Sequence, residues 1–521
     1  MDYSALLQPT PMLLFFVLPL LFILSLLVRG RTKIPYPPGP KGLPIVGNMN
    51  MLDQLNHRGF AKLAEQYGGI LHLRLGVLHV VVVSTPEMAR QVLQAQDINF
   101  SNRPINIAIK YLTYDQADMA FAHYGSFWRQ MRKVCVMRLF SRKRAESWAS
   151  VRDEVDSMIN TVASNSGGPV NVGKIVFSLA MNITYRAAFG SDVLEGQEKF
   201  VSIMQDFSEL FGVFNLADFI PWLGWADPKR CQIHQTLVKA RNSLDVFIDK
   251  IIDEHIAKRK SSDRSDVLDE DAETDMVDDL LAFYSEEKPE KSAESADGQG
   301  SLTLTRDNIK GIIMDVMFGG TETIASLIEW TMTELLKAPE HMKRVQQELK
   351  DVIGLDRMFQ ETDLEKLEYL RCAIKETLRL HPPLPILLHA AAEDAEVAGY
   401  TIPKGSRVLV NVWQIGRDKD SWDEPETYNP ARFLRDDAPN FKGSNFEYLP
   451  FSSGRRSCPG MQLGMYALEL GTAHLLHIFN WELPDGMKPS DIDMSDSVGI
   501  TTPKAVNLVA VPTTRLTCPI F

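Results

Sequence analysis

The sequence predicts one large, mainly α-helical domain with a smaller β portion, behind an N-terminal transmembrane helix. Three observations lead to this fold class: an uncharged apolar run near the N-terminus, long helical patterns in the second half of the chain, and strand-like segments confined to a few short stretches. We find no internal repeat and no second domain boundary after residue 44, so residues 45–521 form a single unit.

The N-terminal apolar run covers residues 11–28, PMLLFFVLPLLFILSLLV, and contains no charged residue. Its length is close to the roughly 20 residues that cross a bilayer. Basic residues follow it directly, so residues 1–10 are expected in the lumen and the bulk of the chain in the cytosol. A cleaved signal peptide is the alternative, but the run lacks a basic flank before it and a small-residue cleavage site after it. Residues 29–44 are basic and proline-rich, which predicts a stiff hinge.

The first part of the domain contains a predicted hairpin, because residues 70–84 are two strand-like runs joined at Gly76. Ser84-Thr85-Pro86-Glu87 then supplies a cap and a first-turn proline for a helix. Residues 261–300 are rich in Asp, Glu, Ser and Lys, which predicts flexible acidic connections on either side of a short helix at 276–284.

Two longer helices are predicted further on. The first runs from Thr305 to about Lys337 and, at about 1.5 Å per residue, spans roughly 50 Å. The second covers about 364–380 and ends before His381-Pro382-Pro383. Strand-like segments recur around 396–412.

Composition excludes several function classes. A net charge of −12 and a pI near 5.5 argue against a nucleic-acid-binding protein. The five cysteines are odd in number and scattered, so a disulfide framework is not expected. The sequence contains no C-x-x-C, no H-E-x-x-H, no G-x-G-x-x-G and no Walker loop, so it predicts neither a zinc site nor a nicotinamide- or flavin-binding module.

The stretch PFSSGRRSCPG (450–460) surrounds one cysteine with glycine, arginine and proline and fits F-x-x-G-x-R-x-C-x-G. Glycines let backbone N–H groups approach a thiolate, and the N-terminus of the following helix favours an anionic sulfur. The arginine two residues before the cysteine can neutralise a carboxylate. These features favour a metal-ligating thiolate over a structural core cysteine. The fixed positions are Phe451, Gly454, Arg456, Cys458 and Gly460.

A second pattern, FGGTET (318–323), lies midway along the first long helix. Each glycine in a helix interior costs about 1 kcal/mol relative to alanine, and a local opening for a bound small molecule is one reason to accept that cost. Glu322 and Thr323 place an acid beside an alcohol. The alternative is a close helix–helix contact made by small residues.

Together these residues resemble the haem-binding signature and the oxygen-activating helix of the cytochrome P-450 superfamily. The resemblance implies that superfamily's fold, haem b (iron protoporphyrin IX) as cofactor and Cys458 as axial ligand of the iron. It also implies that Glu322 and Thr323 deliver protons so that the O–O bond of dioxygen breaks. The sequence departs from the superfamily pattern at Ile324, where a second hydroxyl is usual, and at Ser452, where glycine is usual. We expect proton delivery to rely on Thr323 and water, and the serine to be tolerated.

Further residues are assigned by the same resemblance. Glu376-x-x-Arg379 and Arg432 look like the superfamily's structural Glu-Arg-Arg network. Trp128-x-x-x-Arg132 and His389 look like groups that bind the haem propionates. The expected substrate-pocket residues are Met314, Phe318, Gly319, Leu384, Leu388, Val498, Ile500 and Thr501.

Nearly the whole chain is similar to the plant ferulate/coniferaldehyde 5-hydroxylases, for example in FNLADFIPWLGW (214–225), MFGGTETIAS (317–326) and FKGSNFEYLPF (441–451). This implies hydroxylation of guaiacyl phenylpropanoids next to the phenol, on the route to syringyl lignin. The substrates implied are coniferaldehyde, coniferyl alcohol and ferulate. The residues alone indicate only an apolar, aromatic substrate. A flavonoid 3′-hydroxylase, or a haem protein that is not a monooxygenase, remains an alternative.

The expected partner follows from a basic stretch of the chain and from the absence of a flavin- or nicotinamide-binding motif. Residues 129–144 contain seven basic residues and no acidic one, whether as a docking patch or as a solvated helix face. Oxygen activation needs two electrons, and an acidic NADPH–cytochrome P-450 reductase would fit a basic patch. The resemblance and the N-terminal anchor place the protein in the endoplasmic reticulum membrane, with its catalytic domain in the cytosol. No nucleic acid is expected.

Overall fold

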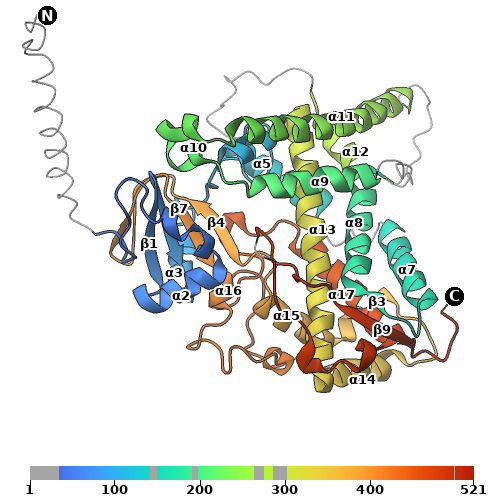
Figure 1. Ribbon diagram of the computed structural model, residues 1–521. Helices are drawn as coiled ribbons and strands as arrows, with labels where there is room; N and C mark the ends of the chain where they lie inside the picture. The colour runs from blue at the N-terminus through green and yellow to red at the C-terminus, as the bar shows by residue number, and fades with distance from the viewer. Residues whose placement is uncertain are drawn as a thin grey trace, which may run out of the picture.

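The computed structural model describes residues 35–140, 149–190, 197–262, 275–285, 302–497 and 499–520. Helices dominate these residues, and a β-sheet lies to one side of them (Figure 1). The prediction of a mainly α fold with a smaller β portion is confirmed. The predicted luminal residues 1–10, the anchor 11–28 and the first part of the hinge lie outside the described residues.

The helices have the following bounds: α2 (His57–Tyr67), α3 (Pro86–Arg90), α4 (Ile107–Leu112), α5 (Ser126–Val134), α7 (Ala149–Ser164), α8 (Val172–Phe189), α9 (Gln197–Phe211), α10 (Leu216–Phe219), α11 (Arg230–Ser262), α12 (Met276–Leu281), α13 (Arg306–Lys337), α14 (Pro339–Ile353), α15 (Glu368–Leu380), α16 (Val412–Ile415) and α17 (Met461–Ile478). The strands are β1 (Ile70–Leu75), β2 (Leu78–Val83), β3 (Val170–Asn171), β4 (Ile386–Ala390), β5 (Ala395–Val397), β6 (Tyr400–Ile402), β7 (Arg407–Asn411), β8 (Phe479–Glu482) and β9 (Val509–Thr514).

The largest sheet has the order β1-β2-β7-β4, with β2 parallel to β7 and the other neighbours antiparallel. The predicted hairpin at 70–84 and the strands around 396–412 are confirmed. Strand β2 is an almost unbroken run of valines, which suits a strand covered on both faces. One face contributes Val80 and Val82 to a core that includes Phe60 of α2, and the other contributes Val81 and Val83 to a second core.

Helix α13 runs through the middle of the helical part (Figure 1). Its N-terminus is a capping box, in which Thr305 accepts from the N–H of Asn308 and the Asn308 side chain accepts from the N–H of Thr305. It ends at Ala338, before Pro339, as predicted. It is the one helix in the described part of the chain long and apolar enough to cross a membrane, but 67% of its apolar stretch is buried, so it is a core helix.

Two predicted helices differ from the structure at their ends. The helix expected from 364 begins at Glu368, because Glu361–Lys366 form a 3-10 turn held by Asp363, which accepts from the N–H of Gln360. The short helix expected at 276–284 ends at Leu281. The start of the predicted acidic segment is helical, since α11 continues to Ser262.

A buried charge network joins α15 to the following loop. Arg379 Nε donates to Glu376 Oε2 at 2.7 Å, and Arg432 Nε donates to Glu376 Oε1 at 3.0 Å. The side chains of Glu376 and Arg379 are 0% exposed. The Nη1 atom of Arg379 donates to the carbonyls of Gly416 and Pro425 at 2.6 Å each. A fully paired buried network fixes the loop, because removing any member leaves a charge without a partner.

We predict that Glu376→Ala lowers the free energy of unfolding by about 3–5 kcal/mol, because two arginines lose their carboxylate in a buried site. Thermal unfolding of the purified protein measures this. Asp437→Ala is the control, since Asp437 pairs with Arg435 at the surface with both side chains exposed. Equal unfolding midpoints for the two variants would contradict the structural role of the network.

Candidate active site

The loop before α17 holds Cys458 in a fixed backbone. Gly454 has φ +69°, and a Cβ on it would lie 2.2 Å from the carbonyl oxygen of Leu93, so only glycine fits. The N–H of Cys458 donates to the carbonyl of Phe451 at 2.9 Å. Ser452 also has a positive φ of 64°, which explains why glycine is usual there and shows that serine is accommodated with some strain.

The Cys458 sulfur has a different environment from the buried core thiols. Its side chain is exposed to a solvent-accessible space. Enough protein surrounds it that burial raises the pKa of the thiol, while the N–H of Gly460 and the positive charge of Arg132 lower it. Burial raises the pKa of Cys135 to about 12 and that of Cys372 to about 11. The pKa of Cys458 is raised like those of the two core thiols, so its exposure and the adjacent N–H of Gly460 are what set it apart as a candidate metal ligand.

Arginine and tryptophan side chains pack beside this loop. Arg132 Nη2 donates to the carbonyl of Ser457 at 2.6 Å, next to the cysteine. The Trp128 ring lies close to two guanidiniums, with Arg456 4.3 Å and Arg132 5.4 Å from its centroid. Trp128 Nε1 donates to the carbonyl of Met119 at 3.0 Å. Helix α5 therefore brings both of its predicted site residues to the cysteine loop.

Arg456 is buried and its guanidinium spans three backbone carbonyls. Nε donates to Ser101 at 2.5 Å, Nη1 to Met119 at 3.2 Å, and Nη2 to Ala122. Burial and the nearby Arg103 lower the pKa of Arg456 to about 9. Because two buried guanidiniums repel each other, their proximity indicates a site that binds an anion.

Sequence reasoning missed Arg103, which belongs to the same cluster. Its Nε donates to the carbonyl of Ala120 at 3.3 Å and its Nη1 to the carbonyl of Leu388. Burial and Arg132 lower its pKa to about 10. One signal was available: Arg103 is the single charged residue within 98–109.

His389 on β4 completes the cluster. Its Nδ1 donates to the carbonyl of Phe100 at 2.8 Å, and its Nε2 is buried without a hydrogen-bond partner among the described residues. Burial and the charge of Arg103 lower its pKa to about 3. A carboxylate next to Nε2 would raise the pKa of His389 and give this nitrogen a hydrogen-bond partner.

The side chains gathered here fit haem. A cysteine sulfur beside a backbone donor suits an iron ligand, and three arginines with one unsatisfied imidazole nitrogen suit two propionate carboxylates. The predicted cofactor-binding residues are thus brought together in one cluster around the cysteine loop, with Arg103 added to them.

On α13 the predicted acid and alcohol face different neighbours. Thr323 Oγ1 donates to the carbonyl of Gly319 at 2.6 Å, and Glu322 accepts from Thr501 Oγ1 at 2.5 Å. The helix is unbroken here, so the paired glycines do not open its backbone. Gly319 is exposed, and a Cβ on it would have no neighbour within 4 Å, whereas a Cβ on Gly320 would lie 3.0 Å from Thr184 Oγ1 of α8. One glycine clears space beside Thr323, and the other permits helix packing.

The predicted pocket residues are placed unevenly. Phe318 joins an aromatic cluster, Leu388 and Thr501 are half-buried, and Leu384 and Ile500 are exposed. Met314 is buried in the packed core. Val498 lies outside the described residues.

The family model described as Cytochrome P450 matches residues 37–509 of this chain. The chain belongs to the cytochrome P450 family. It is 63% identical over 518 residues to "Cytochrome P450 84A1" of Arabidopsis thaliana, with 99% of this chain and 98% of the relative covered. It is 58% identical to "Cytochrome P450 84A4" of the same organism, with 98% and 99% covered.

A solved zebra fish cytochrome P450 with abiraterone shares the fold, with a TM-score of 0.71 and 26% identity, over 88% of this chain and 99% of that chain. Membership in the cytochrome P450 family makes the chain a haem b protein and an oxidoreductase of the monooxygenase type. Such an enzyme uses dioxygen, a small substrate and a reductase as redox partner.

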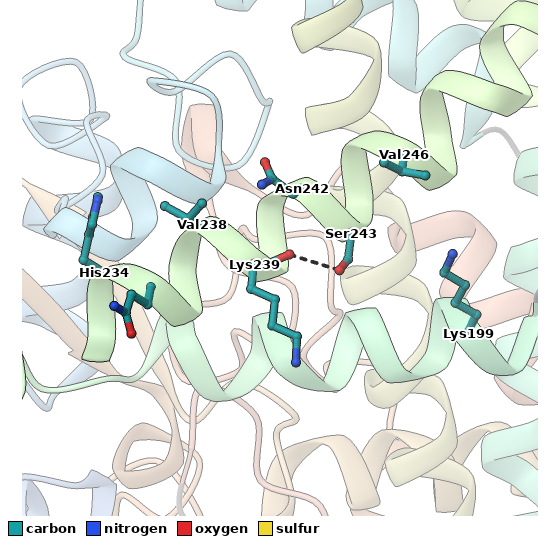
Figure 2. A pocket seen from close by; sticks show the side chains of 8 residues that line it. Lys199, His234, Val238, Lys239, Asn242, Ser243 and Val246 are labelled. Atoms are coloured by element: carbon teal, nitrogen blue, oxygen red, sulfur yellow. Dashed lines mark hydrogen bonds between the residues drawn. The ribbon is translucent and has the colours of Figure 1, made fainter. Parts of the chain in front are cut away.

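A separate groove of about 600 Å³ lies on the outer surface along α11 (Figure 2). It contains none of the predicted site residues. Its lining residues are Lys199, His234, Gln235, Val238, Lys239, Asn242, Ser243 and Val246.

We predict that Cys458→Ser abolishes the carbon monoxide difference spectrum of a haem–thiolate protein, because a serine hydroxyl does not replace a thiolate as iron ligand. Cys231→Ser is the control, since Cys231 is an exposed cysteine on α11. Retention of the wild-type spectrum by Cys458→Ser would exclude Cys458 as the ligand.

Proposed function

We propose that this cytochrome P450 5-hydroxylates guaiacyl phenylpropanoids. One oxygen atom of O₂ converts the ring C–H next to the phenol into C–OH, and the other leaves as water, with two electrons from NADPH and two protons consumed. The observation that carries this proposal is a cluster of phenylalanine side chains beside α13, called the aromatic wall below. The proposal is also supported by the similarity of the chain to the plant ferulate/coniferaldehyde 5-hydroxylases.

The aromatic wall is formed by phenylalanines from three parts of the chain. Phe318 of α13 lies edge-on to Phe211 of α9, with ring centroids 5.3 Å apart, and 6.5 Å from Phe207. Phe121, between α4 and α5, stacks on Phe211 at 6.0 Å. Phe207 and Phe211 are buried, whereas Phe121 and Phe318 are half-buried, so the rings of Phe121 and Phe318 are the ones that can stack against a substrate ring.

Within this proposal Cys458 would ligate the haem iron, and the arginine cluster with His389 would hold the haem propionates. Bound haem supplies the activation of dioxygen and the transfer of one oxygen atom to the substrate. The chain's part is to hold the substrate ring against the wall and to move protons. In this proposal Thr323 passes a proton into the space beside Gly319, and Glu322 is the nearby acid; the open side of Gly319 supports this role.

Exposed aromatic side chains support a membrane-bound location. Trp222 and Trp225 are 59% and 75% exposed, and Leu43 at the end of the hinge and Ile45 just after it are 54% and 62% exposed. Both groups flank the β1–β2 turn, because the N–H of Val77 donates to Phe219 and the N–H of Gly76 donates to Val46. Exposed tryptophans suit the interface of the endoplasmic reticulum membrane.

The basic residues of α5 support docking of NADPH–cytochrome P-450 reductase. Arg129, Lys133 and Arg138 are basic residues along this helix and the turn after it, and Arg132 of the same helix contacts the residue before Cys458. An acidic partner bound there would sit close to the haem-binding loop. Residues 142–144 of the predicted patch lie outside the described residues.

We predict that Thr323→Ala lowers product formed per NADPH consumed several-fold, because the hydroxyl that passes protons is lost. Thr323→Ser should restore most of the coupling. Thr331→Ala is the matched control, as Thr331 makes the same bond to the carbonyl four residues earlier on α13. Unchanged coupling in Thr323→Ala would remove the proton-delivery role.

The substrate assignment is tested by turnover in microsomes with reductase and NADPH, offering coniferaldehyde, coniferyl alcohol, ferulate and a flavonoid. We expect a 5-hydroxylated product from the phenylpropanoids. A 3′-hydroxylated flavonoid as the sole product, with an intact carbon monoxide spectrum, would replace this function by that of a flavonoid 3′-hydroxylase.

A further inference from the structure

Two carboxyl groups that the proposed reaction does not use meet beside α13. Asp118 lies between α4 and α5, and Asp315 lies on α13, and their side chains are hydrogen-bonded to each other. Asp118 is 0% exposed. Asp315 is partly exposed, although it lies in the first third of the core helix α13. A buried carboxyl pair in an otherwise apolar helix face is costly and requires a reason.

The backbone holds this pair in place. Asp315 Oδ2 accepts from the N–H groups of Met119 and Ala120 at 2.8 and 2.9 Å, and Asp118 accepts from the N–H of Phe121 at 3.2 Å. A Cβ on Gly311 would lie 3.0 Å from the Cα of Asp118, so a glycine on α13 permits this approach. The position of the pair is therefore rigid.

Asp315 lies on the same face of α13 as the residues assigned to chemistry. Asp315, Gly319 and Thr323 are spaced four residues apart, so their side chains follow one another along one face. The distance along the axis from Asp315 to Thr323 is about 12 Å. Phe121, whose N–H binds Asp118, belongs to the aromatic wall. The pair is thus a polar group at the far end of an apolar, aromatic surface.

The charges around the pair favour a shared proton. Burial raises the pKa of both carboxyls, and the negative charge of Asp315 raises that of Asp118 further. The opposing groups are Arg456 and Arg103, whose positive charges favour ionisation, and Cys135, which is neutral because burial raises its pKa to about 12. A pair that holds one proton donates one hydrogen bond and accepts others.

We propose that the Asp118–Asp315 pair binds the terminal side-chain oxygen of the substrate and selects an uncharged hydroxyl or carbonyl over a carboxylate. The inference rests on the proposed function and deepens it. With the reacting edge of a guaiacyl ring near Thr323, the three-carbon side chain extends along α13 toward Asp315. Asp315, the partly exposed member of the pair, accepts a hydrogen bond from an alcohol or, when it holds the shared proton, donates one to an aldehyde, whereas the negative charge of the pair repels an acid.

The test measures dissociation constants of the full-length haem-loaded enzyme by substrate-induced absorbance change at neutral pH. The probes are coniferyl alcohol, coniferaldehyde and ferulate. For Asp315→Asn, which removes the charge, we expect the ratio of the ferulate to the coniferyl alcohol dissociation constant to fall about tenfold. For Asp118→Asn, which removes the carboxyl that shares a proton with Asp315, we expect coniferaldehyde to bind several-fold more weakly and coniferyl alcohol to bind as before. Asp307→Asn, on the first turn of the same helix, is the control.

Unchanged ratios in Asp315→Asn, in a protein with an intact carbon monoxide spectrum, overturn the inference. If Asp315→Asn does not retain haem, the coniferaldehyde dissociation constant of Asp118→Asn is the test instead. An unchanged dissociation constant in that variant overturns the inference. Hydroxylation of the phenylpropanoids by the wild type together with unchanged ratios removes the inference alone. Failure of the wild type to bind any of the three probes removes the proposed function and the inference with it.

Discussion

The peptide groups on either side of Met119 join the two halves of the site. The N–H of Met119 donates to Asp315 on α13, and its carbonyl accepts from Trp128 of α5 and from Arg456 of the cysteine loop. One short segment between α4 and α5 is thereby fixed to the helix that carries the acid–alcohol pair and to the loop that carries the thiolate. This segment therefore fixes the position of the cysteine loop relative to α13, in addition to the packing of the helices.

Electrostatics explains why this junction is built from charged groups. The chain carries a net charge of −12, yet three arginines gather beside Cys458. The proposed haem site would bring two carboxylates to that side, and the Asp118–Asp315 pair adds negative charge on the side of α13. Each buried charge is therefore opposed by another, and backbone groups satisfy most of the remaining donors and acceptors. The Glu376 network follows the same rule further from the site.

Local signals allow much of this to be predicted. The motif at 450–460, the capped helix after Thr305 and the hairpin around Gly76 are each specified by residues close in sequence, and the structure contains the corresponding elements. Interactions between distant residues cannot be predicted in this way. Arg103 and the Asp118–Asp315 pair become meaningful only when the fold brings separate segments together. The predicted start of α15 is wrong because a 3-10 turn and an α-helix show the same apolar spacing over one turn.

Gly311 has a consequence for the size of molecule that the enzyme accepts. Its missing side chain sets how closely the segment carrying Asp118 and Phe121 approaches α13. The distance between this segment and the helix limits how thick a molecule bound against Phe318 can be. A flat ring fits a narrow gap between the two, and a bulkier, puckered ring system needs a wider gap. A single methyl group at position 311 would widen that spacing, and it would also move the Met119 carbonyl that accepts from Trp128 and Arg456.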